Sequence, residues 1–153
     1  MAEIVLINFD AVWTHVTKEF CCGHDSIHGP DHWQRVERNA LKISASNGAI
    51  VDVVRLFAVF HDSRRENDGV DSEHGKRAAA YAASLRGVLF DLSDEHFKLL
   101  HYACRWHTDG KLSEDPTIGA CWDADRLDLG RVGIVTKAEL MSTHLGRSLC
   151  LRG

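Results

Sequence analysis

The sequence has no apolar run that approaches the ~20 residues needed to span a bilayer. It has no Cys-x-x-Cys pair, and its five cysteines are odd in number, which favours reduced thiols over a disulfide framework. Residues 1–10 carry no basic leader and are too short to be typical of a secretory signal. These absences predict a cytoplasmic protein without a membrane anchor.

An excess of basic residues is also missing. The net charge of -4 and the pI near 6.2 argue against nucleic-acid binding through a basic surface. Hydrophobic content of 44% and charged content of 26% are ordinary for a globular protein. We find no internal repeat, linker or low-complexity tract, so the 153 residues are expected to form a single domain, 1–153, with a proper core.

Hydrophobic periodicity favours helices in nearly every long segment. The segment 50–62 is apolar on nearly every side, and its length exceeds the ~4–8 residues of a usual strand, so it too is expected to be a helix. The pattern predicts an all-α fold of about six or seven helices. The expected helices cover residues 9–21, 30–47, 50–62, 76–89, 93–108, 116–130 and 137–144.

A histidine and an aspartate, His61 and Asp62, end the apolar segment 50–60. A buried carboxylate without a partner is costly enough that it would rather be neutral. A divalent cation satisfies both side chains at once, because imidazole and carboxylate are both common metal ligands. The pair therefore indicates a metal site if the chain supplies further ligands.

Two further ligand-type residues lie on the core-facing sides of their expected helices. His32 precedes Val36, Ala40 and Ile43 at helical spacing, and Asp125 lies in the apolar line of residues 118–129. A carboxylate in the middle of such a line is out of place without a partner. Three helices thus point ligand-type side chains inward.

The order His, His-Asp, Asp resembles the HD-domain superfamily of metal-dependent phosphohydrolases. The outer ligands stand in His-Trp-Gln-Arg-Val, residues 32–36, and Ala-Asp-Arg-Leu, residues 124–127, and the resemblance covers about residues 28–130. It implies a helical bundle in which His32, His61, Asp62 and Asp125 bind a metal. This mixed nitrogen and oxygen set suits Mn²⁺, Fe²⁺, Co²⁺, Ni²⁺ or Zn²⁺ better than an all-oxygen Mg²⁺ or Ca²⁺ cage.

The resemblance also suggests the catalytic carboxylates, Asp62 and Glu66. In several members an acidic residue three or four places after the doublet acts with the metal-bound water. Glu66 has this position, on the face of Asp62 if the helix continues; the alternative is a solvated loop carboxylate. Arg64 and Arg65 are candidates for a bidentate phosphate clamp.

Three more histidines are candidate site residues. His28 and His74 could line a substrate pocket or bind a second metal, and His107 is similar to a histidine that some members place in the site. Asp123 and Asp128 are expected to hydrogen-bond to neighbouring histidines or arginines. The polar segment 63–75, with its Asn-Asp-Gly turn, is predicted to be a mobile lid facing the substrate.

The leading functional hypothesis is a metal-dependent phosphohydrolase that acts on a small phosphate ester or a nucleotide. One alternative is an oxygenase, because some proteins of this fold hold two irons with extra histidines. Another is a regulatory domain that binds a metal or nucleotide without catalysis. The sequence does not select a substrate.

Overall fold

The computed structural model describes residues 6–152, and residues 1–5, which include half of the segment examined for a secretory signal, lie outside this range. The described residues form seven α-helices and no β-sheet, which confirms the predicted all-α fold. The α-helices are α1 (Phe9–Glu19), α2 (Pro30–Asn47), α3 (Val51–Phe60), α4 (His74–Leu85), α5 (Asp94–Trp106), α6 (Pro116–Arg126) and α7 (His144–Arg152); two 3-10 helices, η1 (Leu129–Val132) and η2 (Ala138–Leu140), precede α7.

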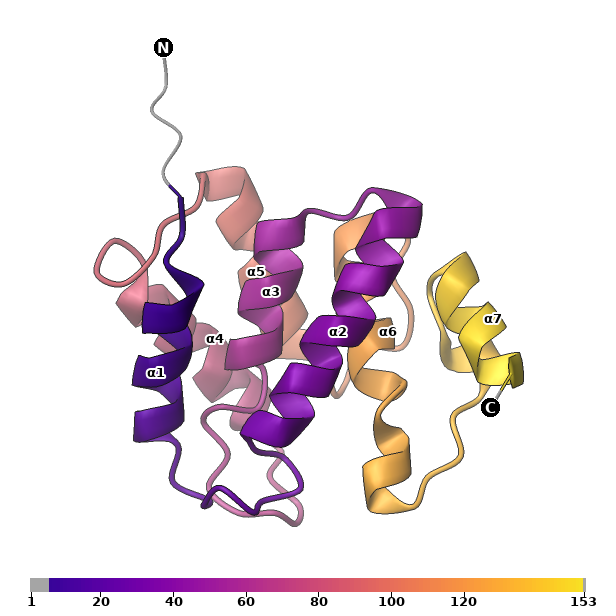
Figure 1. Ribbon diagram of the computed structural model, residues 1–153, viewed down its shortest axis with the longest axis horizontal. Helices are drawn as coiled ribbons and strands as arrows, with labels where there is room; N and C mark the ends of the chain where they lie inside the picture. Colours follow the sequence, from indigo (N-terminus) through magenta and orange to yellow (C-terminus); the bar gives the residue numbers. More distant parts are fainter. Residues whose placement is uncertain (1–5, 153) are drawn as a thin grey trace.

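Helix α3 is the centre of the bundle and packs against α1, α2, α4, α5 and α6 (Figure 1). Seven of its ten residues are buried, which explains why its sequence is apolar on nearly every side. Helix α2 lies beside it and also packs against α6, while α4 and α5 pack against each other. The end of α3 therefore lies where several helices meet.

Typical capping residues mark the ends of α2 and α6. Pro30 and Pro116 occupy the first turns of α2 and α6, and the Asp115 side chain accepts hydrogen bonds from two backbone N–H groups of α6. Helix α2 ends at Asn47 and is capped by Gly48, whose φ of 75° is the left-handed conformation that glycine adopts without steric cost. These ends fix the positions of the two helices that carry His32 and Asp125.

The C-terminal part differs from the prediction. Helix α6 ends at Arg126 instead of Gly130, and the segment 137–144 contains only η2, with the last helix at His144–Arg152. The buried Asp123 carboxylate explains why the last helix begins at His144, because it accepts hydrogen bonds of 2.7 Å from the backbone N–H groups of Ser142 and Thr143. Asp123 therefore holds the start of α7 instead of a neighbouring histidine or arginine.

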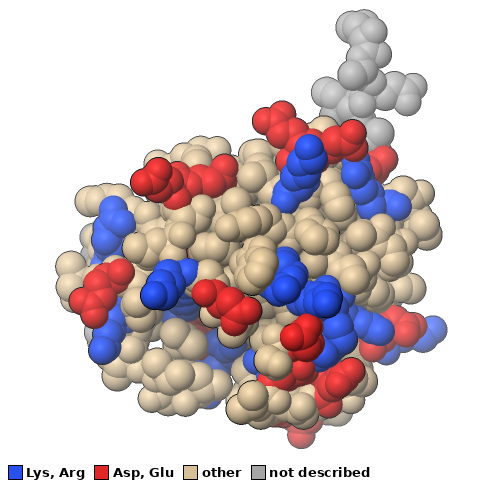
Figure 2. Space-filling model, turned by 180° about the vertical axis from the view of Figure 1, so that it is seen from behind, with Lys and Arg blue, Asp and Glu red and all other residues tan. Residues whose placement is uncertain are grey.

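Within residues 6–152, none of the helices combines the length and the apolar composition that crossing a membrane would require. On the face opposite to that of Figure 1, Lys and Arg side chains lie beside Asp and Glu side chains (Figure 2). All five cysteines lie within the described range, and none forms a disulfide.

Candidate metal centre

His32 lies in the first turn of α2, and its side chain is fully buried. Its Nδ1 lies 2.7 Å from Oδ2 of Asp128, which also accepts hydrogen bonds from Arg35. The residue predicted to support a ligand thus contacts both a histidine and an arginine. Because Nδ1–H donates to Asp128, the neutral ring presents the lone pair of Nε2 to the interior.

His61 follows the last residue of α3 and is also fully buried. Its Nδ1 lies 2.9 Å from the carbonyl oxygen of Ala58 and 3.1 Å from that of Phe57, and the ring stacks on Phe57. The carbonyl groups can only accept, so Nδ1 carries the hydrogen and Nε2 is left with its lone pair. The two rings therefore have the same tautomer in their neutral forms.

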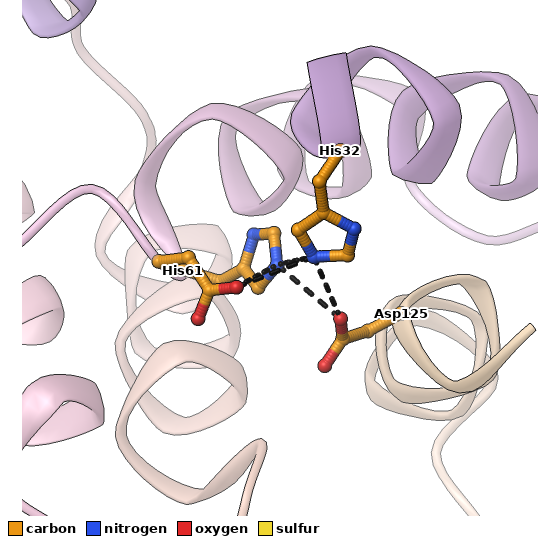
Figure 3. Close-up of side chains that lie close together, drawn as sticks. His32, His61 and Asp125 are labelled. Carbon is orange, nitrogen blue, oxygen red and sulfur yellow. Dashed lines mark hydrogen bonds and ion pairs between the residues drawn. The ribbon is translucent and has the colours of Figure 1, made fainter. Parts of the chain in front are cut away.

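Both rings turn Nε2 toward the same two carboxylates. Nε2 of His32 lies 3.2 Å from Oδ2 of Asp62 and 3.1 Å from Oδ1 of Asp125. Both corresponding distances from Nε2 of His61 are 3.4 Å. Figure 3 shows His32, His61 and Asp125 converging on one point from α2, from the end of α3 and from α6.

The spacing of these atoms fits a bound metal ion. The two Nε2 atoms lie 3.1 Å apart, so five of the distances between the four ligand atoms are 3.1–3.4 Å. Ligands bound to one transition metal at ~2.0–2.2 Å lie about 3 to 3.5 Å from one another. Two neutral imidazoles facing two carboxylates also have no hydrogen to place between them, so the cluster needs a cation. These residues can hold a metal.

Asp62 belongs to a second such group as well. Its Oδ1 lies 3.2 Å from Nε2 of His74 and 3.4 Å from Nε2 of His107, and these nitrogens lie 2.9 Å apart. Nδ1 of His74 contacts the carbonyl oxygen of Asp71, and Nδ1 of His107 contacts that of Cys104. The second pair of rings therefore also presents Nε2 lone pairs, with Asp62 between the two groups.

A close approach of α4 and α5 makes this second group possible. A Cβ atom on Gly75 would lie 2.8 Å from the carbonyl oxygen of Arg105 and 2.9 Å from that of Cys104. Only a residue without a side chain permits this distance, because backbone atoms on a packed helix cannot yield. Glycine next to His74 thus brings the ring to His107.

The electrostatics of the first group follow from burial and hydrogen bonding. Burial lowers the pKa of His32, but hydrogen bonds with Asp125, Asp128 and Asp62 outweigh this effect and raise it from 6.5 to about 10. Burial alone would raise the pKa of Asp62 and of Asp125, but the facing histidines, first among them His61, hold both pKa values well below 3.8. Without a metal, a proton on His32 is therefore the cation between the carboxylates.

A pocket of about 250 Å³ opens beside the cluster. It brings together six residues predicted for the site, His28, Asp62, Arg65, His74, His107 and Asp125. Its other walls are Thr108, Arg126, Leu129, Arg131 and Val132. The volume suits a small ligand.

Glu66 and Arg64 do not line this pocket. Helix α3 ends at Phe60, so the premise that Glu66 follows Asp62 on a continuing helix is wrong, and its side chain is 68% exposed beside Arg77. The Arg64 guanidinium lies over the ring of Tyr81. Both residues instead line a separate hollow on the surface.

The segment that follows Asp62 is tied to the segment before α2. The Cys21 and Cys22 thiols both donate to the carbonyl oxygen of Arg65, at 3.1 and 3.3 Å, and Ser26 donates to Asp68. Helix α4 begins at His74, so the predicted lid is shorter than residues 63–75. These contacts hold Arg65 in place at the pocket wall.

Three polar residues of the pocket were not predicted from the sequence: Arg131, Arg126 and Thr108. Arg131 lies in η1, one residue beyond the expected helix 116–130. Nη2 of Arg131 lies 3.3 Å from Nδ1 of His28, whose Nε2 contacts the carbonyl oxygen of Asp68. The sequence offers no distinctive signal for Arg131, because its position depends on the turn after α6.

No protein-family model matches the sequence, and no curated protein sequence matches it. The fold has a counterpart in the crystal structure of a predicted HD superfamily hydrolase from an uncultured Thermotogales bacterium, with a TM-score of 0.73 and 25% sequence identity. The alignment covers 95% of this chain and 84% of that chain. With its helices arranged in this way and its buried histidines and aspartates converging, the chain has the fold of the HD-domain superfamily.

Proposed function

We propose that the protein is a metal-dependent phosphohydrolase acting on a small phosphate ester or nucleotide. The observation that carries the proposal is the convergence of His32, His61, Asp62 and Asp125 at ligand spacing, beside a pocket with arginines in its wall. Carboxylates and imidazoles would hold a divalent transition metal, and the guanidinium groups would bind the phosphoryl oxygens.

A divalent metal in such a site supplies an activated water and polarises the phosphoryl oxygen. The residues of the chain orient the components. Nδ1–H bonds to Asp128 and to the end of α3 fix the rings of His32 and His61. Arg65 and Arg131 lie at the pocket wall, where they would offset charge that develops on the phosphoryl group.

Glu66 as the proton-transfer group stays a prediction, and its exposed position beside Arg77 does not support it. We therefore expect Glu66→Gln to retain hydrolysis. A large fall in kcat with unchanged metal content would instead restore Glu66 to the mechanism through a change of loop position.

A metal-by-substrate screen tests the proposal. The wild type is assayed with Mn²⁺, Fe²⁺, Co²⁺, Ni²⁺ and Zn²⁺ on aryl phosphates, nucleotides and phosphodiesters, together with Asp125→Asn and the exposed Asp31→Asn as the matched control. We expect slow hydrolysis that Asp125→Asn abolishes and Asp31→Asn retains. Absence of hydrolysis with every metal would refute the proposal.

The second group, formed by Asp62, His74 and His107, favours one alternative function. Two metal groups that share a carboxylate would also suit a di-iron oxygenase. Iron-loaded protein that consumes oxygen and shows an optical change on oxidation, without phosphoester hydrolysis, would support this alternative over the hydrolase.

We further propose that residues 1–153 form one domain that acts in the cytoplasm on a small phosphorylated substrate. The five free thiols support a reducing compartment. Fractionation of native cells with an antibody against the protein tests the location.

A further inference from the structure

Two guanidinium groups flank Asp62 from opposite sides. Nε of Arg65 lies 3.5 Å from Oδ1, and Nη2 of Arg131 lies 3.9 Å from Oδ2. The two side chains are only 11% and 10% exposed, and both line the pocket beside the metal ligands. Two largely buried positive charges next to a site for a cation need a reason, because they repel the cation that the site would bind.

Arg131 is held rigidly by the backbone. Its Nε donates to the carbonyl oxygen of Ile27 and its Nη1 to that of Asp128, both at 2.9 Å. Nη2 donates to Nδ1 of His28, which is a lone-pair acceptor because Nε2–H of this ring donates to the carbonyl oxygen of Asp68. These bonds use three of the five N–H groups and leave the Nη1 and Nη2 edge with one hydrogen each for a ligand.

Arg65 is held in the same way from the other side. Its Nη1 donates to the carbonyl oxygens of Asn67 and Gly69, while its own carbonyl oxygen accepts from the thiols of Cys21 and Cys22. Its buried Nε forms no hydrogen bond with any residue between 6 and 152. Oδ1 of Asp62 lies 3.5 Å from this Nε, beyond the ~2.7–3.2 Å of a usual N–H···O hydrogen bond, so this donor is available to an oxygen atom of a bound ligand.

The charges in the pocket select between kinds of phosphate ester. Asp62 and Asp125 contribute two negative charges, and Arg65, Arg126 and Arg131 contribute three positive charges, whereas Asp128 is paired with Arg35. One divalent metal brings the total to about +3, and a second would raise it further. A phosphomonoester above its second pKa of ~6 carries two negative charges, whereas a diester carries one.

We infer that Arg65 and Arg131 form a two-sided clamp for a terminal phosphoryl group and that the substrate is a phosphomonoester instead of a phosphodiester. The inference rests on the proposed function and narrows it to one substrate class. Each guanidinium is fixed by backbone carbonyls before the ligand arrives, so little order is lost on binding.

Binding of two small probes to metal-loaded protein tests the clamp. Inorganic phosphate is a dianion at pH 8, and dimethyl phosphate is a monoanion of similar shape. Titration calorimetry with Arg65→Gln and Arg131→Gln should give a Kd for phosphate at least tenfold above the wild-type value in each variant. The wild type should bind phosphate at least tenfold more tightly than dimethyl phosphate, and this ratio should fall in both variants.

Arg38→Gln is the matched control, because Arg38 is an exposed residue of α2 outside the pocket; it should change the Kd by less than twofold. Arg131→Lys keeps the charge but loses the forked guanidinium, so its Kd for phosphate should lie between those of the wild type and of Arg131→Gln. Arg131 also supports the backbone, so metal content and Tm are measured for each variant. If Arg131→Gln does not fold, Arg131→Lys and Arg65→Gln decide the result.

Phosphate binding within twofold of the wild type in Arg65→Gln and Arg131→Lys would overturn the clamp, as would equal affinity for the two probes. Hydrolysis is scored separately, on an aryl phosphate and on a bis-aryl phosphate. If neither is hydrolysed but the arginines still control phosphate affinity, the proposed function fails and the clamp stands. If diesters are hydrolysed faster than monoesters, the phosphohydrolase stands and the clamp assignment fails.

Discussion

Nδ1 of His32 lies 2.7 Å from Oδ2 of Asp128, so this carboxylate fixes the direction in which the ring presents Nε2. The contact joins the start of α2 to the turn after α6, across 96 positions of the chain. The same carboxylate binds Arg35, which neutralises its charge. Asp128 thus orients a candidate ligand without facing the metal position.

The first prediction concerns this orienting contact. Asp128→Asn should weaken metal binding about 10–100-fold, since an amide is a poorer partner for the imidazole N–H and leaves Arg35 unpaired. Asp31→Asn removes the same charge from an exposed position of α2 and should leave the affinity unchanged. Competition with a chromogenic chelator gives both affinities. Equal affinity in the two variants would show that His32 needs no orienting carboxylate.

The second prediction concerns proton release. In the metal-free protein the pKa of His32 is raised from 6.5 to about 10, so a metal must displace a proton over this range. We expect the metal Kd to fall about tenfold for each pH unit between about 7 and 9, with about one proton released at pH 8. Calorimetry in two buffers with different ionisation heats measures the proton count. A Kd independent of pH would contradict the shift.

The same pKa values predict how the metal-free protein responds to pH, which is the third prediction. The native state binds the His32 proton more tightly than the unfolded state, so this stabilisation is complete below pH 6.5 and is lost as pH rises toward 10. Asp62 and Asp125 have pKa values well below 3.8, so their contribution is lost as pH falls below that value. Chemical unfolding should show maximal stability between these limits. Stability that rises from pH 7 to 10 would refute this account.

The fourth prediction uses the contact between α4 and α5. Gly75→Ala should push the helices apart, because the new Cβ would meet two backbone carbonyl oxygens below 3 Å. We expect a loss of stability of about 1–3 kcal/mol. The rings of His74 and His107 should separate. A metal held by Asp62, His74 and His107 should therefore be lost before one held by the group with His32. Gly130→Ala is the control, since a Cβ there meets nothing within 4 Å. Urea unfolding and metal counts on both variants provide the comparison.

The sequence was sufficient to place His32 and Asp125 because their helical spacing from apolar neighbours is a local property. The two roles of Asp62 were not predictable in this way. They depend on Gly75, which brings His74 to His107 through a contact between helices. The position of Arg131 depends on the change from α6 to a 3-10 helix after Arg126, whereas the sequence pattern predicted a regular helix to residue 130. The helical premise for Glu66 was wrong for the converse reason, since it required α3 to extend beyond Phe60.

The last prediction separates the two candidate ligand groups. Asp62 contributes Oδ2 to the group with His32, His61 and Asp125, and Oδ1 to the group with His74 and His107. Asp62→Ala should therefore remove all bound metal, whereas Asp125→Ala leaves the second group complete and should retain part of it. Loss of metal should also lower Tm, because an ion bound only to the native state stabilises that state by mass action.

Elemental analysis and thermal unfolding, each with and without excess chelator, measure these effects. The wild-type Tm should fall on chelation, that of Asp125→Ala should fall less, and that of Asp62→Ala should stay constant. Asp52→Ala, on the exposed side of α3, controls for loss of a carboxylate from the same helix. Equal metal content in Asp62→Ala and Asp125→Ala would mean that the two groups do not share Asp62, because only the loss of a shared ligand would empty both groups.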